Sequence, residues 1–354
     1  MTHLVPGIVA RALAGIVVCS LAQRVDAQPF LYVSHQDDDS VGVVDTSTNT
    51  LVDTIPVGDG PQDIAILPDG SMLYVANAIS DTVSVIDTTT RTVVGTVTVG
   101  MNPVGMAIHP DGSMIYVSNA ADNTVSFIET AGNTVVDTVG VGETPVGIEI
   151  SPDGSVLYVA NRGGNTVSVI ETTTNTVIDT VPVGGSPNQM GIHPSGALVY
   201  VPSIADDTVC VMYAATNTVV ATLAFPVGSS PVVVAIHPSN DAIAYVTNIN
   251  GDTVAVVDLT TNTVVDTITV APGPLGLAFD TDGTTLYVSL FTGGGVAVID
   301  TATRVVTGTI PTGTAPVELI VTPTAPCPGD INGDGVIDVS DFFAFVAAFA
   351  AGCP

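Results

Sequence analysis

The chain contains no lysine and no tryptophan, and only five of its 354 residues are basic. Its 34 acidic residues give a formal net charge of −29. This charge argues against a nucleic-acid backbone or an anionic membrane surface as partner, because both would repel the protein. The composition favours a cation, a cationic partner or a neutral glycan instead.

Long hydrophobic runs are also lacking, so the sequence predicts no membrane span. The apolar run at residues 12–22 follows Arg11 and precedes small residues at 25–27. That order is typical of a secretory signal peptide. We therefore expect residues 1–27 to be removed and the mature protein to be secreted or held at a bacterial cell surface.

Cysteine is scarce, with four in the chain. Cys327 and Cys353 bracket the last segment, and an oxidising compartment would favour a disulfide between them. Cys210 lies inside an apolar strand pattern and is expected to be a buried, inert thiol.

Tyrosine reveals an internal repeat. Seven of the eight tyrosines precede a valine, and they recur every 42 residues except for one interval of 45. A proline follows the same period. The tyrosines are Tyr32, Tyr74, Tyr116, Tyr158, Tyr200, Tyr245 and Tyr287.

Each repeat contains four short β-branched segments separated by Gly, Pro, Asn or Asp. In one unit they lie at residues 61–70, 73–77, 82–87 and 92–100. Four strands in about 42 residues are typical of a propeller blade. We name these strands A to D and predict an all-β, seven-bladed β-propeller of four-stranded antiparallel blades over residues 28–323.

The ends of the repeat array complement each other. It opens with a B strand at residues 30–33 and closes with an A strand at residues 316–322. We expect the C-terminal A strand to join the N-terminal B, C and D strands in one split blade. Such closure would protect edges that otherwise invite aggregation.

The segments Tyr245–Asn248, Tyr74–Asn77 and Tyr116–Asn119 resemble the YVTN-type β-propeller repeat, and the resemblance covers about residues 30–323. It implies a propeller fold and an exported, cell-surface setting. It does not imply one activity, since propellers carry many.

The loops between strands B and C are rich in Asp and Asn and are expected to gather around one mouth of the channel. Binding residues often lie on such loops, although Asx residues also simply form turns. Arg162 is the only positive charge among them. The predicted ligand-face residues are Asp37, Asp38, Asp39, Asp81, Arg162, Asp206, Asp207 and Asp252.

His109, His193 and His237 recur at the end of strand A. Because different blades hold them apart, we expect a turn-packing role rather than a shared metal site. The sequence predicts no catalytic residue, since hydrolase, zinc and haem motifs are absent.

A short linker at residues 324–329 precedes a predicted calcium module at residues 330–354. Oxygen ligands stand at the spacing of an EF-hand loop, with Gly335 at the turn. The predicted Ca²⁺ ligands are Asp330, Asn332, Asp334, Val336 through its carbonyl, Asp338 and Asp341. This loop resembles a dockerin repeat. True dockerins carry two such repeats, and this chain has one, so the resemblance supports a cohesin-like partner only weakly.

We infer from the sequence a secreted or cell-surface scaffold that binds an extracellular protein or glycan. One alternative is a propeller hydrolase, lactonase-like or acting in polysaccharide breakdown. The other is a structural surface-layer component. A clustered acid–base pair with perturbed pKa values in the channel mouth would favour the enzyme, whereas a flat, polar mouth would favour a scaffold or a structural component.

Overall fold

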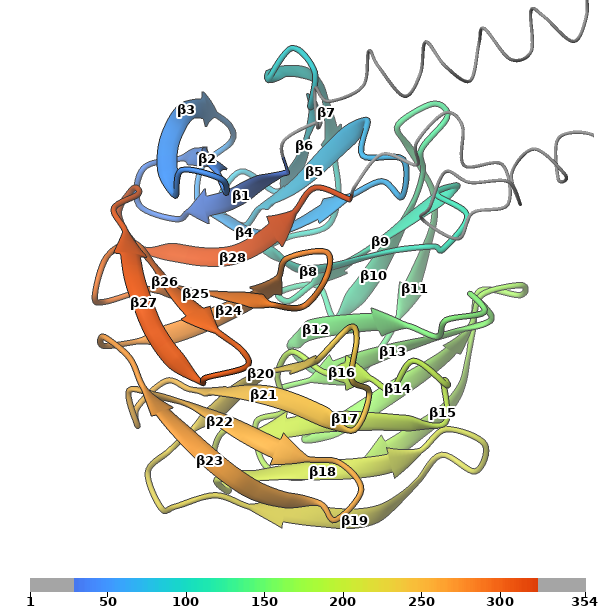
Figure 1. The fold of residues 1–354 in the computed structure, drawn as a ribbon. Helices are drawn as coiled ribbons and strands as arrows, with labels where there is room; N and C mark the ends of the chain where they lie inside the picture. The colour runs from blue at the N-terminus through green and yellow to red at the C-terminus, as the bar shows by residue number, and fades with distance from the viewer. Residues whose placement is uncertain (1–28, 324–354) are drawn as a thin grey trace, which may run out of the picture. The chain divides into compact units, whose positions relative to one another are not determined.

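The computed structural model describes residues 29–323. They form seven antiparallel sheets of four strands each, arranged as the blades of a propeller (Figure 1). Within this range no residue is helical, and no helix is long and apolar enough to cross a membrane. The predicted all-β propeller is therefore confirmed. The predicted signal peptide, the linker, the calcium loop and the Cys327–Cys353 pair lie outside the described residues.

We number the blades by the chain order of their B strands and give strands A to D in turn. Blade 1 comprises β28 (Pro316–Val321), β1 (Phe30–His35), β2 (Ser40–Asp45) and β3 (Thr50–Pro56). Blade 2 comprises β4 (Pro61–Ile66), β5 (Met72–Asn77), β6 (Thr82–Asp87) and β7 (Thr92–Thr98). Blade 3 comprises β8 (Pro103–Ile108), β9 (Met114–Asn119), β10 (Thr124–Glu129) and β11 (Thr134–Gly140). Blade 4 comprises β12 (Pro145–Ile150), β13 (Val156–Asn161), β14 (Thr166–Glu171) and β15 (Thr176–Pro182).

The remaining blades follow the same order, with a shortened A strand in blade 5. Blade 5 comprises β16 (Gly191–Ile192), β17 (Leu198–Ser203), β18 (Thr208–Tyr213) and β19 (Thr218–Ala224). Blade 6 comprises β20 (Pro231–Ile236), β21 (Ile243–Asn248), β22 (Thr253–Asp258) and β23 (Thr263–Thr269). Blade 7 comprises β24 (Pro274–Phe279), β25 (Thr285–Leu290), β26 (Val296–Asp300) and β27 (Val305–Ile310).

The hydrophobic core lies between neighbouring blades. Tyr32 of blade 1, for example, packs in one cluster with Ile64, Leu73 and Ile86 of blade 2. The repeated tyrosines of the B strands are all buried, between 1% and 3% exposed. Cys210 is likewise buried and is a free thiol, as predicted.

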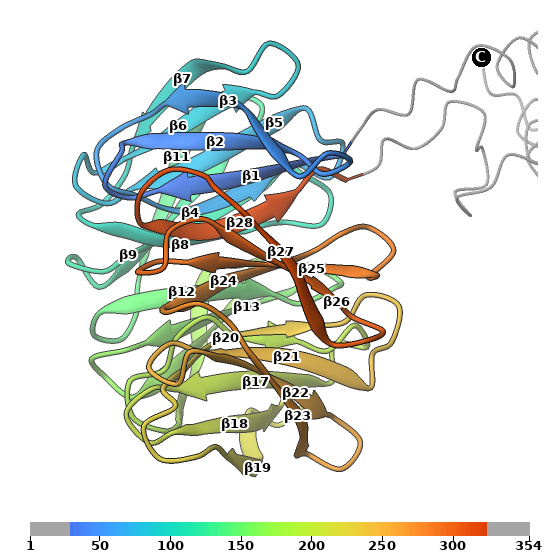
Figure 2. The same ribbon diagram turned by 60° about the vertical axis from the view of Figure 1, so that its left-hand side comes forward.

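The last strand of the ring pairs with the first. β28 runs antiparallel to β1, with Leu31 opposite Val321 and Val33 opposite Leu319. The two strands lie side by side in both ribbon views (Figure 1 and Figure 2). The sheet of blade 1 is thus assembled from both ends of the described chain, in the order β28-β1-β2-β3.

A buried hydroxyl in four B strands links each of those blades to the next. Ser118 accepts the N–H of Gly105 in its own blade at 2.9 Å and donates to the carbonyl of Val146 in blade 4 at 2.7 Å. Gly105 permits this close approach, since a Cβ there would lie about 2.0 Å from the Val146 carbonyl oxygen. The other hydroxyls are Ser34, Thr247 and Ser289, which donate to Gln62, Leu275 and Val317.

Most B strands end in an asparagine that supports the loop between strands D and A. Asn119 donates to Thr124 at 3.0 Å and to Ser126 at 2.9 Å, and Gly100 of the loop lies directly on it. In blade 1 His35 takes this place, and its Nε2 accepts the N–H of Gly313 at 2.9 Å. Burial lowers the pKa of His35 to about 4.

Candidate functional site

Most of the predicted ligand-face carboxylates hold neighbouring loops in place. Asp81 has a left-handed backbone with φ of 54°, and its Oδ1 accepts the N–H of Asn102 in the next D–A loop at 2.8 Å. Asp39, Asp207 and Asp252 make the same contact with Gly60, Ser230 and Gly273. Asp38 and Asp206 accept N–H groups of Thr314 and Gly185. Asp37 instead borders a surface cavity beside Phe291.

Arg162 stands apart from the other arginines of the described chain. Arg91 pairs with Asp53 at 3.7 Å and Arg304 with Asp266 at 3.2 Å, so both arginines link neighbouring blades. Arg162 has no ion pair within residues 29–323 and borders the central channel. Burial lowers its pKa. It is the one cation of this range that is free for a ligand.

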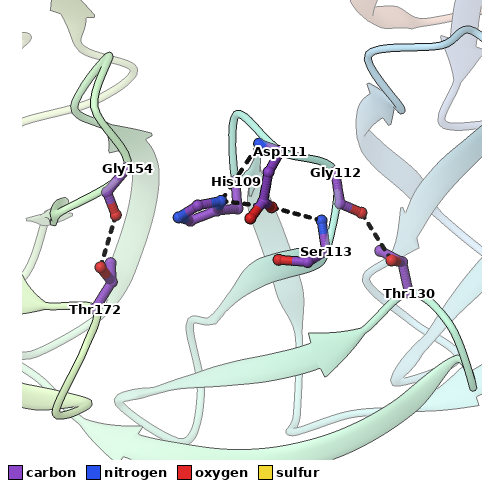
Figure 3. Close-up of polar contacts among 7 residues, drawn as sticks. All are labelled: His109, Asp111, Gly112, Ser113, Thr130, Gly154 and Thr172. Carbon is purple, nitrogen blue, oxygen red and sulfur yellow. Dashed lines mark hydrogen bonds and ion pairs between the residues drawn. The ribbon is translucent and has the colours of Figure 1, made fainter. Parts of the chain in front are cut away.

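The three recurrent histidines hold the turns between strands A and B. His109 Nδ1 lies 2.6 Å from Asp111 Oδ1, and Asp111 also accepts the N–H of Ser113 (Figure 3). His193 pairs with Ser195 at 2.8 Å, and His237 accepts the N–H of Ser239. Each imidazole thus has a turn partner in its own blade. Residues 29–323 contain no group of three His, Cys, Asp or Glu side chains that could hold one metal ion.

The A strands line a central channel with two compartments. The outer cavity, about 100 Å³, is bordered by the starts of the strands, including Gln62, Asn188 and Leu275, and by Arg162. The inner channel, about 460 Å³, is bordered by their later residues, including Ile66 and Ile150. Asp63, Gln189, Val233 and Glu318 border both, so they mark where the compartments meet.

Three carboxyl groups face this channel from different blades. Asp63 is 8% exposed, while Glu149 and Glu318 are partly open to the channel. Asp63 accepts the N–H groups of Ile64 and Met106, and Glu318 accepts that of Leu319 at 3.1 Å. Glu149 has no hydrogen bond or ion pair to any described residue.

The enclosure of these carboxyl groups by protein raises their pKa values. Burial raises the pKa of Asp63 to about 7, against the lowering effect of its two N–H partners. Burial, followed by the charge of Asp63, raises the pKa of Glu149 to about 8. The same two causes, in that order, hold the pKa of Glu318 well above its usual range. No basic residue lines the inner channel, and Arg162 borders the outer cavity alone.

The channel carboxyls were not among the residues predicted from sequence. A signal does exist once the repeats are aligned on their proline. Two residues after it, Asp63 and Glu318 stand where three other blades have Gly105, Gly147 and Gly276. Four residues after the proline, Glu149 stands where other blades have alanine, glycine or isoleucine. The composition hid this signal, because the loops carry many more acidic residues.

This arrangement can bind a cationic group or transfer protons near neutral pH. Carboxyls with pKa values near 7 and 8 exchange protons readily at that pH. Most of the inner wall is apolar, and its volume lies in the range of small-molecule sites.

Comparison with known families gives two partial matches. Residues 1–115 match the family described as YNCE-like beta-propeller. Residues 106–235 match the family described as Lactonase, 7-bladed beta-propeller. Comparison with curated protein sequences finds no match. These results support the seven-bladed propeller.

Solved structures share the fold at low sequence identity. The hydrazine synthase of Kuenenia stuttgartiensis is 23% identical with a TM-score of 0.69, covering 75% of this chain and 90% of that one. A protein of unknown function from Desulfotomaculum acetoxidans is 18% identical with a TM-score of 0.74, covering 82% of this chain and 98% of that one. The dihydro-heme d1 dehydrogenase NirN is 16% identical with a TM-score of 0.62, covering 82% and 74%. At these identities the likeness concerns the fold alone.

Proposed function

We propose that the protein is an exported binding protein whose propeller takes a small ligand into its central channel. The observation that carries this proposal is the placement of Asp63, Glu149 and Glu318 around the inner channel, whose lining contains no basic residue. Other blades close the same ring with uncharged residues at these positions, mostly Gly or Ala. Enclosed charges cost stability, and Glu149 makes no hydrogen bond to the described chain that would offset this cost, so its presence points to a function.

The mouth of the channel adds recognition chemistry. Arg162 and the amides of Gln62, Asn188 and Gln189 border the outer cavity. Together they supply one positive charge and several hydrogen-bond donors and acceptors. An extracellular glycan or protein loop that covers this mouth remains our proposed larger partner, while the acidic surface disfavours nucleic acid.

Export and attachment complete the proposal. The sequence pattern at residues 1–27 supports secretion or display at the cell surface, and the loop at residues 330–341 supports Ca²⁺-dependent attachment or assembly. The test is a calorimetric titration of Ca²⁺ into the full chain, with the Asp330→Ala/Asp334→Ala double variant as control. Equal heats from both proteins would refute the calcium site.

A second candidate function is hydrolysis. The carboxyl groups of Asp63 and Glu149, with pKa values of about 7 and 8, could act as an acid–base pair, and residues 106–235 match a lactonase family. We expected an acid–base pair in the channel mouth to favour an enzyme; Asp63 borders the outer cavity, while Glu149 borders the inner channel only. An assay of wild type and Glu149→Gln with a panel of lactones distinguishes hydrolysis from binding. Hydrolysis of a lactone by the wild type that is lost in the variant would favour the hydrolase.

The binding function is tested by blocking the channel. Ala235 borders the inner channel, and Ala235→Leu would fill part of it without adding charge. In a thermal-shift screen of small metabolites, binding hits should stabilise wild type and lose their effect in this variant. Hits that stabilise both proteins equally would place binding elsewhere and overturn the proposal. The melting temperature without ligand shows whether the variant folds.

A further inference from the structure

The inner channel is polar at one end and apolar along its length. Asp63, Gln189 and Glu318 border the end where it meets the outer cavity, and Glu149 lies two positions farther along its strand. The rest of the wall is largely aliphatic. Isoleucines at or near the ends of six A strands form its far part: Ile66, Ile108, Ile150, Ile192, Ile236 and Ile320.

The carboxyl groups at the polar end have unused hydrogen-bonding capacity. Glu149 is partly open to the channel and has no hydrogen bond or ion pair to the described chain, although a carboxylate can accept several hydrogen bonds. Glu318 accepts one N–H, from Leu319. Both carboxyl groups open to the channel, so a ligand in the channel can donate hydrogen bonds to them.

The charge of the three carboxyl groups and the distance between them indicate which kind of ligand fits the channel. Three acidic side chains repel an anion and attract a cation. They do not converge as a metal site, since no group of three such side chains in residues 29–323 could hold one ion. A larger cation that donates hydrogen bonds in several directions suits them better than a compact metal ion, and the apolar wall requires an apolar body.

We propose that the inner channel binds an alkylammonium ligand, with its ammonium group among Glu149, Glu318 and Asp63 and its hydrocarbon chain along the isoleucine wall. This inference deepens the proposed binding function and rests on it. An ammonium has three N–H donors, and its donation to carboxylates makes charge-assisted hydrogen bonds. The channel volume of about 460 Å³ accommodates a small amine of this kind.

The test is calorimetric titration of the full chain with hexylammonium chloride at pH 8.5. We expect saturable binding to one site, and no such binding of 1-hexanol or hexanoate, which have the same chain without the positive charge. Glu149→Gln and Glu318→Gln should each weaken binding about tenfold or more, the loss expected for one charge-assisted hydrogen bond. Glu171→Gln, an acid outside the channel, is the matched control and should bind like wild type.

Proton release on ligand binding tests whether the carboxyl groups contact the ligand, because carboxyl groups that only stabilise the fold would release no protons. The titratable groups bordering the channel and its mouth are Asp63, Glu149, Glu318 and Arg162. Aliphatic amines stay protonated below about pH 10, so only the carboxyls change charge between pH 6 and 8.5. Binding should tighten with rising pH and release protons, seen as a dependence of the heat on the ionisation enthalpy of the buffer.

Three outcomes would overturn the proposal: hexanol binding as well as hexylammonium, unchanged binding by both Gln variants, or no binding of hexylammonium at any pH. The results also distinguish a wrong ligand class from a wrong binding function. If hexylammonium does not bind but other compounds still lose their stabilising effect in Ala235→Leu, only the ligand class is wrong. If no compound depends on the open channel, the binding function itself fails.

Discussion

The Asp63 carboxylate of blade 2 accepts the backbone N–H of Met106, in blade 3, at 2.6 Å. It also accepts the N–H of Ile64 at 2.7 Å. The same side chain therefore faces the channel and joins two innermost strands. Its charge destabilises the ring while its hydrogen bonds stabilise it, and pH determines the balance.

Asp63→Ala should destabilise the propeller by about 2 kcal/mol at pH 5, because two N–H groups lose their acceptor. The folded-state pKa of about 7 lies above the unfolded value, so the wild type loses stability as pH rises toward 7. The loss caused by the substitution should consequently be smaller at pH 9. Urea denaturation at both pH values measures the difference, and equal losses would contradict the proposed balance.

Glu149→Gln should leave stability almost unchanged at pH 4 and raise it at pH 9. Folding raises the pKa of Glu149 from 4.5 to about 8, so the wild type loses stability as the pH rises between these two values. The gain at pH 9 is bounded by about 5 kcal/mol, and water in the channel will reduce it. Thermal unfolding of variant and wild type across this range gives the measurement. Glu171→Gln serves as control, and a variant less stable than wild type at pH 9 would count against an uncompensated charge.

His35→Asn should remove an acid sensitivity in blade 1. The pKa of His35 falls from its ordinary 6.5 to about 4 on folding, so the unfolded chain binds the proton first. Wild type should therefore lose up to about 3 kcal/mol as pH falls from 6.5 to 4. Asparagine ends the B strand in four other blades and carries no titrating group. The difference in unfolding free energy between variant and wild type should follow this window, and a flat difference would refute it.

Ser118→Ala should destabilise the fold by about 1–3 kcal/mol, because it leaves Gly105 N–H and the Val146 carbonyl without their buried partner. Ala76 and Ala160 occupy the equivalent positions of blades 2 and 4, so alanine itself fits there. Thr89→Ala in an exposed turn is the control. A Ser118 variant as stable as that control would show that the hydroxyl link contributes nothing.

Deletion of residues 316–354 should abolish cooperative unfolding or cause aggregation, since it removes β28 and exposes an edge of β1. Deletion of residues 324–354 alone keeps all described strands and should leave the unfolding midpoint of the propeller unchanged. Size-exclusion chromatography and calorimetry of the two truncations test the role of the pairing directly. A soluble, equally stable 1–315 chain would contradict it.

The fold was predictable because it depends on a local pattern repeated seven times. The Tyr-Val pair marks a buried B strand in every unit, and the strands fall within a few residues of their expected places. Blade 5 is the exception: its A strand shrinks to Gly191–Ile192, and the backbone near Gln189 instead makes an isolated bridge to Val233. Composition around Pro187 did not reveal this shortening.

The channel site was harder to predict because it depends on ring closure. Asp63, Glu149 and Glu318 are up to 255 residues apart in sequence, and each looks like ordinary acidic variation in an acidic chain. Only the ring turns their side chains toward one shared space. The loop residues Asp81 and Asp252 drew attention for their charge, whereas their carboxylates accept N–H groups of the D–A loops that lead into the next blade.

The pairing of β1 with β28 also determines how the ring responds to force. Thr322 donates its N–H to the Phe30 carbonyl at 2.8 Å, and the Phe30 N–H is bonded to Thr322 Oγ1 at 2.9 Å. Tension applied through these two residues would load the ladder one hydrogen bond at a time, in an unzipping geometry, rather than shearing all bonds together. A pull between the ends would therefore separate β28 from β1 at low force, whereas the same protein held by one end alone would transmit no load across this seam.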